Sequence, residues 1–506
     1  MTPLVHMGLG YDDLLVPALV HAGFDTRDLV LVARTDANLA WVRRHAPRAT
    51  TVRLPYAAAR KANVVSGLAP HAALKRACAG VGLDPLDLLV SERALRRNRV
   101  DTAMNFLNLA AEELEAVVAD RGPMLALVEF TVTSELLTAG LVTHHGGLAT
   151  WPRGIRLPSD RFGLIGAPKG ITLWQRQVED PSAVAAGQAF LDTWRAQHGR
   201  PMGFARNLKV ETGQEIWRLA SDRIREFALD RGANLQLPRP TDYARLPWLN
   251  PVKARLNLRE YSGRRWDPVP EKFVFLPLQV QPESSADVMG QEWRDQAYTA
   301  RVLAEALAPL GIGVAVKEHA HFMWRRDPDY WPQFDAHPNI ATIDPFADSR
   351  ELMKQAVFTV TATGTVGLEA GLLGLPVVTG AEMPWSGLGN VARLASPDDL
   401  TQFVADRGWE SLRADQASID EWFVHDYVRN SWEGLVLDPP RVPPVLEPDN
   451  IRKVGGALAE AAASLGHAPA AGDPATALPA GPTAPATSQT SATTATTPAT
   501  ATTGTV

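Results

Sequence analysis

The chain has 506 residues, of which 45% are hydrophobic and 21% are charged, a balance typical of a soluble globular protein with two or three domains. This composition excludes a mainly disordered chain, a collagen and a coiled coil. There are 50 basic and 56 acidic residues, so the net charge is −6, and there is no Lys/Arg block, which argues against nucleic acid as the main partner.

The expected compartment follows from three features of the sequence. The single cysteine, Cys78, cannot form an internal disulfide, which fits a reducing compartment. The first residues, MTPLVHMGLGYDD, lack the basic and apolar regions of a signal peptide. No stretch reaches the roughly 18–20 uninterrupted apolar residues of a membrane span. We therefore expect a cytoplasmic protein.

Strand and helix patterns alternate over residues 1–170. Apolar runs predict strands, and amphipathic stretches predict helices. In chain order, the expected elements are a strand at 3–7, a helix at 11–23, a strand at 29–33, a helix at 37–45, a strand at 50–54, a helix at 103–119 and a strand at 124–130. This alternation indicates a parallel sheet covered by helices on both faces.

The middle of the chain, residues 171–270, has weaker periodicity. Residues 180–199 and 212–231 have helical patterns, whereas 237–270 is rich in Pro, Arg and Trp and predicts an interdomain linker. We therefore treat 171–270 as a helical insert and linker.

A second alternating region covers residues 271–465. Its expected elements are strands at 273–278, 313–317, 341–343, 358–361 and 376–379, and helices at 295–310, 349–356, 365–373, 398–406 and 451–464. The predicted fold class is therefore α/β, with two Rossmann-like domains (1–170 and 271–465) that face a cleft. Residues 466–506, rich in Ala, Thr and Pro, are expected to be a disordered tail because they have too little apolar surface to form a core.

The strongest local motif is TATGTVGLEAGLLGLPVVTG, from Thr361 to Gly380, in which a strand leads into a helix. Gly364 permits a tight turn, and Thr363 or Thr365 can cap the helix or contact a phosphate at its N-terminus. Glu369, one turn further, can accept hydrogen bonds from a ribose diol. The alternative is that Thr365 is only a helix cap and Glu369 faces solvent.

Two further motifs place polar residues directly after apolar strands. FLPLQVQPESS ends in a polar cluster that includes Glu283, and VAVKEHAHFMW continues from its strand into Lys317 and His319. Such positions suit ligand binding in open α/β sheets. Lys317 and His319 can stabilise a leaving phosphate, and His319 can also donate a proton. No Cys or Asp cluster completes a metal site around the histidines, so we expect no metal.

Weaker candidates lie in the first domain. Asp13 follows the Gly8-Leu9-Gly10 turn and is a candidate general base, although an incomplete glycine pattern is weak support. The loop at 144–147 and the arginines of WPRGIRLPSDRF, residues 151–162, are more simply explained as surface structure.

Four motifs taken together resemble the capsule and surface polysaccharide biosynthesis proteins, GT-B-like enzymes related to bacterial Kdo-transferring capsule proteins. These motifs are FVFLPLQVQPESS, VKEHAHFMW, HPNIATIDPFADSRELMKQA and VTATGTVGLEAGLLGLPVVTG. The resemblance covers roughly residues 273–380. It matches Glu283 to a glutamate of the family, and Lys317 and His319 to a Lys-x-His-Pro motif in which Ala320 replaces the proline. Residues matched to the family's nucleotide-sugar site are Gly364, Thr365, Gly367, Glu369 and Ala370.

The resemblance implies a GT-B-like glycosyltransferase that uses a nucleotide-sugar donor. The donor is a substrate, and no cofactor is expected. Thr363, with the matched residues and Lys317, would hold the donor, while Glu283, His319 and Asp13 would serve catalysis. The implied acceptor is a glycan or lipid-linked glycan, with peripheral contact to the inner membrane or an export complex as a further option. Two alternatives stay open: a nucleotide-sugar 2-epimerase-like enzyme and a non-catalytic biosynthesis or export partner.

Overall fold

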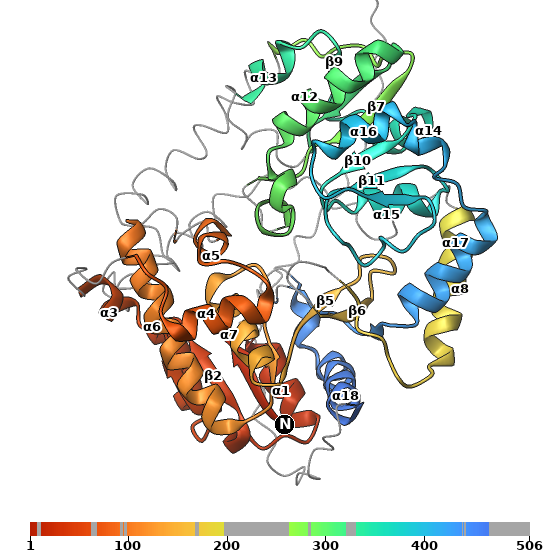
Figure 1. Cartoon of the computed structure of the whole chain (residues 1–506). Coiled ribbons are helices and arrows are strands. Elements are labelled where there is room, and N and C mark those ends of the chain that lie inside the picture. Colours follow the sequence, from red (N-terminus) through yellow and green to blue (C-terminus); the bar gives the residue numbers. More distant parts are fainter. Residues whose placement is uncertain are drawn as a thin grey trace, which may run out of the picture.

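The computed structural model describes residues 1–7, 12–61, 68–91, 95, 99–166, 172–196, 263–281, 285–319, 330–437, 439 and 442–464. Two sheets, each with a parallel core, form the frame of the molecule (Figure 1). The predicted α/β class with two Rossmann-like domains is therefore confirmed. Glu283, the helix expected at 212–231 and the tail at 466–506 lie outside the described residues.

The first sheet has seven strands in the order β13-β6-β5-β4-β1-β2-β3. The five from β5 to β3 are parallel, and β6 and β13 add antiparallel edges. The strands are β1 (Thr2–His6), β2 (Val30–Ala33), β3 (Thr50–Arg53), β4 (Met124–Leu127), β5 (Leu148–Gly154), β6 (Arg161–Ile165) and β13 (Trp432–Glu433). Buried apolar runs in the central strands allow helices to cover both faces of the sheet.

Helices pack on both faces of the first sheet and form two separate apolar cores. One face carries α1 (Asp12–His21), α2 (Asp36–His45) and α18 (Pro448–Ser464). The other carries α3 (Tyr56–Lys61), α4 (Ala72–Val81), α5 (Pro85–Ser91), α6 (Val100–Arg121) and α7 (Thr133–His144). Helices α4 and α7 cross at Gly80 and Gly140, where a Cβ on Gly80 would lie 2.0 Å from the Gly140 carbonyl oxygen. Only glycine permits this close approach of the two backbones.

The second sheet has six parallel strands in the order β12-β11-β10-β7-β8-β9. The strands are β7 (Phe273–Pro277), β8 (Gly313–Lys317), β9 (Ile340–Ile343), β10 (Thr359–Thr361), β11 (Val377–Thr379) and β12 (Val391–Arg393). Helices α12 (Gln296–Leu307), α13 (Pro332–Asp335) and α16 (Asp399–Ala405) cover one face, and α14 (Ser349–Gln355), α15 (Val366–Leu372) and α17 (Gln416–Trp422) cover the other. This order is that of a doubly wound, Rossmann-like sheet.

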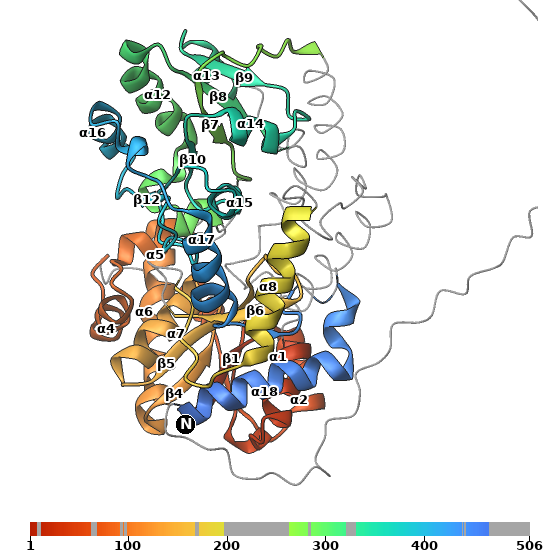
Figure 2. The ribbon, with the colours of Figure 1, turned by 90° about the vertical axis from the view of Figure 1, so that its right-hand side faces the viewer.

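After the second sheet the chain returns to the first. The helical turn η8 (Phe423–Val428) packs against α8 (Pro181–Ala196), β13 pairs with β6, and α18 lies along α1 (Figure 2). The boundaries drawn from the sequence at 170, 270 and 465 stay predictions, but the last helix packs on the first sheet rather than the second. An apolar stripe on α18, which includes Val454, Leu458 and Ala461, is buried by this contact.

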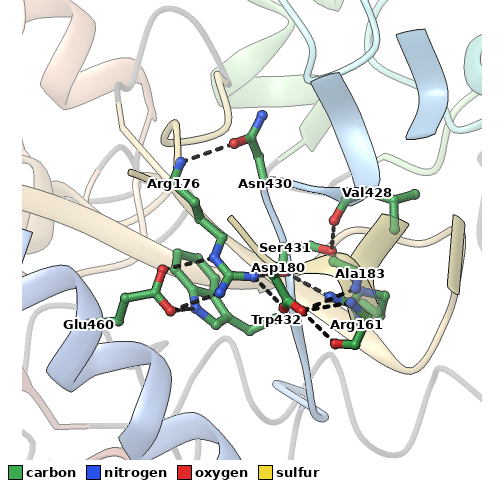
Figure 3. A network of polar contacts seen from close by, with 10 residues as sticks. Arg161, Arg176, Asp180, Ala183, Val428, Asn430, Ser431, Trp432 and Glu460 are labelled. Carbon is green, nitrogen blue, oxygen red and sulfur yellow. Dashed lines mark hydrogen bonds and ion pairs between the residues drawn. The ribbon is translucent and has the colours of Figure 1, made fainter. Parts of the chain in front are cut away.

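A buried polar network connects this C-terminal segment to the first domain (Figure 3). Arg176 donates two hydrogen bonds of 2.8 Å to the carboxylate of Glu460 on α18 and one of 2.8 Å to Asp180. Arg161 and Arg176 both donate to the backbone oxygen of Ser431, just before β13. Because both guanidinium groups are almost fully buried and hydrogen-bonded, the network fixes the position of the last helix.

Each sheet has its carboxyl edge on the side of the other domain. Arg153, in the last part of β5, has its Nη1 atom 3.8 Å from the sulfur of Met289, in the turn that follows β7. Among the described residues, no helix combines the length and apolar character that a bilayer crossing requires.

Candidate functional site

The topological switch point of the second sheet lies between β7 and β10, where the strand order reverses. Ligands of open α/β sheets bind outside the carboxyl ends of strands at such a point. Gln279 follows β7 and Thr363 follows β10, and their side chains meet there. Gln279 Nε2 donates to Thr363 Oγ1 at 2.7 Å, and the Thr363 backbone N–H donates to Gln279 Oε1 at 3.3 Å. Thr363 Oγ1 donates in turn to the Ser285 carbonyl at 3.1 Å.

Two more glutamines extend this contact into a network. Gln296, on α12, donates from Nε2 to the Gln279 carbonyl at 3.1 Å and to Gln281 Oε1 at 2.6 Å. Gln281 Nε2 donates to Asp287 Oδ1 at 2.9 Å. The polar cluster predicted after the first strand of this domain thus holds the turn that follows β7 in a fixed shape.

The turn after β10 explains the glycine at position 364. The Gly364 backbone N–H donates to Thr361 Oγ1 at 2.9 Å, and a Cβ at position 364 would lie 2.6 Å from that same oxygen. Thr365 is exposed, and its side chain does not cap α15. The predicted turn into a helix is therefore present, and Thr365 occupies the N-cap position of α15 without the side-chain hydrogen bond of a cap.

Glu369 lies on α15, one turn beyond Thr365. Its carboxyl is partly covered, and it makes no hydrogen bond or ion pair with any described residue. Burial raises its pKa from 4.5 to about 7, against the opposing effect of nearby Arg350. The sequence alternative of a solvent-facing Glu369 is thus wrong. An uncompensated acid at a sheet's carboxyl edge is typical of functional sites.

Two cations lie at the same edge. Lys317 ends β8 beside β7, and the Leu278 N–H donates to its carbonyl at 2.7 Å. Burial lowers the pKa of the Lys317 amine, although Asp344, Glu318 and Asp348 raise it. Arg350, at the start of α14, has a buried Nε atom with no hydrogen-bond partner in the described structure.

We call Gln279, Lys317, Arg350, Thr363 and Glu369 the second-sheet cluster. Its members come from the carboxyl ends of three strands and the first turns of two helices on one face. The group combines two cations with an acid, an amide and a hydroxyl. Such a set can bind an anion and a polyhydroxylated group together. Arg350 was not among the residues predicted from the sequence, although it follows a predicted strand at the start of a predicted helix.

Other predicted residues are placed as follows. Gly367 packs against Trp385, and a Cβ there would lie 2.1 Å from the indole, so packing alone accounts for this glycine. His319 is exposed just beyond β8, and its backbone N–H donates to Glu318 Oε1 at 2.8 Å. Asp13 is exposed on α1 and accepts a hydrogen bond of 2.7 Å from Trp41 Nε1. Their functional roles stay predictions.

The structure also places residues of the weaker motifs of the first domain. Residues 144–147 connect α7 to the start of β5, so they lie at the edge of the sheet opposite its carboxyl ends. In the 151–162 segment, Arg161 is engaged by Ser431 and is not available to an anion. In the described parts of the chain, no three His, Cys, Asp or Glu side chains are grouped so as to hold a metal ion.

No protein-family model matches this chain, and no curated protein matches it. Among solved structures, the chain is similar to KpsC, a beta Kdo 2,7 transferase of Thermosulfurimonas dismutans, with 12% identity, 65% of this chain and 84% of that chain covered, and a TM-score of 0.31. It is similar to the calicheamicin glycosyltransferase CalG4, with 14% identity, coverage of 92% and 99%, and a TM-score of 0.26. It is also similar to the UDP-GlcNAc 2-epimerase of Methanocaldococcus jannaschii, with 9% identity, coverage of 83% and 97%, and a TM-score of 0.24. These are distant matches to proteins of the GT-B fold.

Proposed function

We propose that the protein is a glycosyltransferase that moves a sugar from a nucleotide-sugar donor to a glycan or lipid-linked glycan during assembly of a capsular or other surface polysaccharide. The observation that carries the proposal is Glu369, a partly covered carboxyl with no partner among the described residues and a pKa of about 7, at the carboxyl edge of a doubly wound sheet. The surface-polysaccharide context comes from the resemblance of the four motifs.

A ribose diol can donate the hydrogen bonds that the Glu369 carboxylate lacks. Burying a carboxylate without hydrogen bonds costs free energy, and a ligand that supplies two hydroxyl donors removes part of that cost. The ribose would therefore bind the ionised form of Glu369. Donor binding and loss of the proton from Glu369 are coupled in this account.

The cations of the second-sheet cluster suit the phosphates of the same donor. Lys317 is a buried cation, and Arg350 has an Nε–H group without a hydrogen-bond partner. A phosphate can therefore interact with the charge of the first and accept a hydrogen bond from the second. During transfer, the bond between the anomeric carbon and the phosphate oxygen breaks, and negative charge develops on the leaving phosphate. Fixed cations beside that oxygen lower the barrier by electrostatic stabilisation.

The test is a product analysis with UDP-, GDP- and CMP-sugars and a panel of mono- and oligosaccharide acceptors. We expect one donor class to yield free nucleotide and a new glycoside, with the rate abolished in Lys317→Met and retained in Glu351→Gln. Glu351 is a matched control because it is an exposed acid on α14 that pairs with Lys354. An isomerised donor without a new glycoside would instead establish an epimerase, and no turnover of any donor would favour a non-catalytic partner.

A further inference from the structure

The first sheet has its own topological switch point, between β1 and β4. Three neighbouring strands end there with polar residues: His6 ends β1, Arg34 follows β2, and Glu129 follows β4. This edge is on the side of the second domain, as the Arg153–Met289 contact shows. The position therefore corresponds, in the first domain, to that of the second-sheet cluster in the second.

Glu135, on α7, is fully engaged and buried, so it has a positioning role. Arg34 Nη2 donates to one of its carboxylate oxygens, and the Glu129 backbone N–H donates to the other. The Glu135 side chain is 6% exposed. Glu135 thus fixes the backbone of residue 129 relative to the guanidinium group of Arg34.

Glu129, in contrast, uses only one of its carboxylate oxygens in hydrogen bonds with the described residues. Its Oε1 atom accepts a hydrogen bond of 2.6 Å from the Thr131 hydroxyl, and its Oε2 atom accepts none from the described residues. The side chain is partly exposed, so a substrate can reach it. One oxygen held in place and the other unoccupied is the arrangement that a proton acceptor needs.

His6, at the end of β1, adds a second acceptor without a partner to this group of strand ends. Its Nε2 atom lies 2.6 Å from Thr138 Oγ1, and the Thr138 hydroxyl donates to the Ser134 carbonyl at 3.0 Å. Thr138 must therefore accept from His6 Nε2–H, which leaves Nδ1 as a lone-pair acceptor. That atom is buried and has no hydrogen-bond partner, in a residue only 4% exposed. Burial, reinforced by Arg34, holds the His6 pKa well below its ordinary value, so the ring is neutral.

We propose that this first-sheet cluster (His6, Arg34, Glu129, Glu135 and Thr138) binds the acceptor sugar, with Glu129 as the catalytic base. The assignment rests on the proposed function. The acceptor hydroxyl gives its proton to Glu129 Oε2 while its oxygen bonds to the anomeric carbon. The bond from that carbon to the donor phosphate breaks, and the nucleotide leaves with the bonding electron pair.

This assignment differs from the sequence expectation of Asp13. Asp13 projects from the first turn of α1 toward Trp41 on α2, and both helices lie on the opposite face of the sheet from α7, which carries Glu135 and Thr138. Glu129 is held at the switch point through its backbone N–H and one carboxylate oxygen, whereas Asp13 is exposed and has the single Trp41 bond. The two acids can therefore be compared directly by substitution.

The experiment measures nucleotide affinity by calorimetry and transfer rate in wild type, Glu129→Gln, Glu129→Ala, Asp13→Asn and Glu112→Gln. UDP, GDP and CMP serve as binding probes, and the donor that the wild type turns over serves as substrate. Glu112 is the matched control because it is an exposed acid of the same domain, paired with His71. We expect Glu129→Gln to bind nucleotide within about twofold of wild type and to lose about 100-fold or more in kcat. Added formate should restore part of the Glu129→Ala rate, and chloride should not.

Two results would overturn the assignment while leaving the proposed function intact. One is a Glu129→Gln enzyme that keeps more than about a third of the wild-type kcat, since loss of a general base costs far more. The other is loss of transfer in Asp13→Asn with retention in Glu129→Gln. A wild type that binds no nucleotide, or binds it and transfers no sugar, would overturn the proposed function and the base assignment together.

Discussion

Gln279 and Thr363 lie 84 residues apart in the chain and hold each other through two hydrogen bonds across the switch point of the second sheet. The amide of Gln279 donates to the hydroxyl of Thr363 and accepts from its backbone N–H. Thr363 therefore has its hydroxyl hydrogen directed to Ser285. This pair joins the carboxyl ends of β7 and β10, so the frame of the site is set before any ligand binds.

Thr363→Val should lower the free energy of unfolding by about 1–3 kcal/mol, because it leaves the Gln279 amide and the Ser285 carbonyl without a buried partner. Urea unfolding followed by tryptophan fluorescence measures the change. In a double-mutant cycle with Gln279→Leu, we expect a coupling of about 0.5–3 kcal/mol. Strictly additive costs would show that the two side chains do not support each other.

Glu369 should make the unliganded protein less stable as the pH rises. Its pKa is raised from 4.5 to about 7, so the folded state binds more protons than the unfolded state between those values. Stability from this group is therefore present below pH 4.5 and is lost as the pH rises to about 7. At pH 8, we expect Glu369→Gln to be more stable than wild type by about 1–3 kcal/mol. Thermal unfolding of both proteins at pH 5 and pH 8 tests this prediction. An equal difference in stability between Glu369→Gln and wild type at the two pH values would refute it.

Gly367→Ala should destabilise the second domain through Trp385. The added methyl would overlap the indole, and overpacking of this kind costs about 1–3 kcal/mol. Trp385→Leu in the same chain should recover part of that loss in melting temperature. If Gly367 instead bound the donor directly, Gly367→Ala would weaken nucleotide binding, and Trp385→Leu would not restore it.

Arg176→Met should be strongly destabilising because it leaves Glu460 and Asp180 without their buried cation. Breaking such a pair costs about 3–5 kcal/mol. The control is Lys453→Met, which removes an exposed pairing with Glu433 and should cost under about 1 kcal/mol. Chemical unfolding compares the two variants. A similar small loss for both would mean that the network of Figure 3 does not hold the last helix.

Local patterns were enough to predict many of the repeating strands and helices, although not β5, β6, α4, α5 or β12. The buried run at Phe273–Pro277 and the amphipathic stretch within Val100–Arg121 are examples. Helix α7 was missed because its residues from Thr133 to Val142 are all buried, so it has no polar face to give a helical period. Strand β13 was missed because its two residues become a strand only by pairing with β6, far away in the chain.

The candidate site was predictable where a polar residue ends or directly follows an apolar strand, as at Lys317 and Thr363. Glu129 and Arg34 follow apolar strands in the same way, and that rule would have found them. The unpartnered state of Glu369 and the Gln279–Thr363 pair depend on contacts between distant segments, which no local pattern contains. The direction of Asp13 depends likewise on the position of Trp41.

The most direct test of the account is calorimetric titration of the full chain with UDP, GDP and CMP at pH 6, 7 and 8. It compares wild type, Glu369→Gln and the control Glu351→Gln. We predict that one nucleotide binds wild type and Glu351→Gln about tenfold more tightly at pH 8 than at pH 6, because the ribose needs the ionised Glu369. Glu369→Gln should bind weakly and without that rise, which also separates Glu369 from titration of the phosphate. Equal affinity in wild type and Glu369→Gln at every pH would contradict the placement of the donor at the second-sheet cluster.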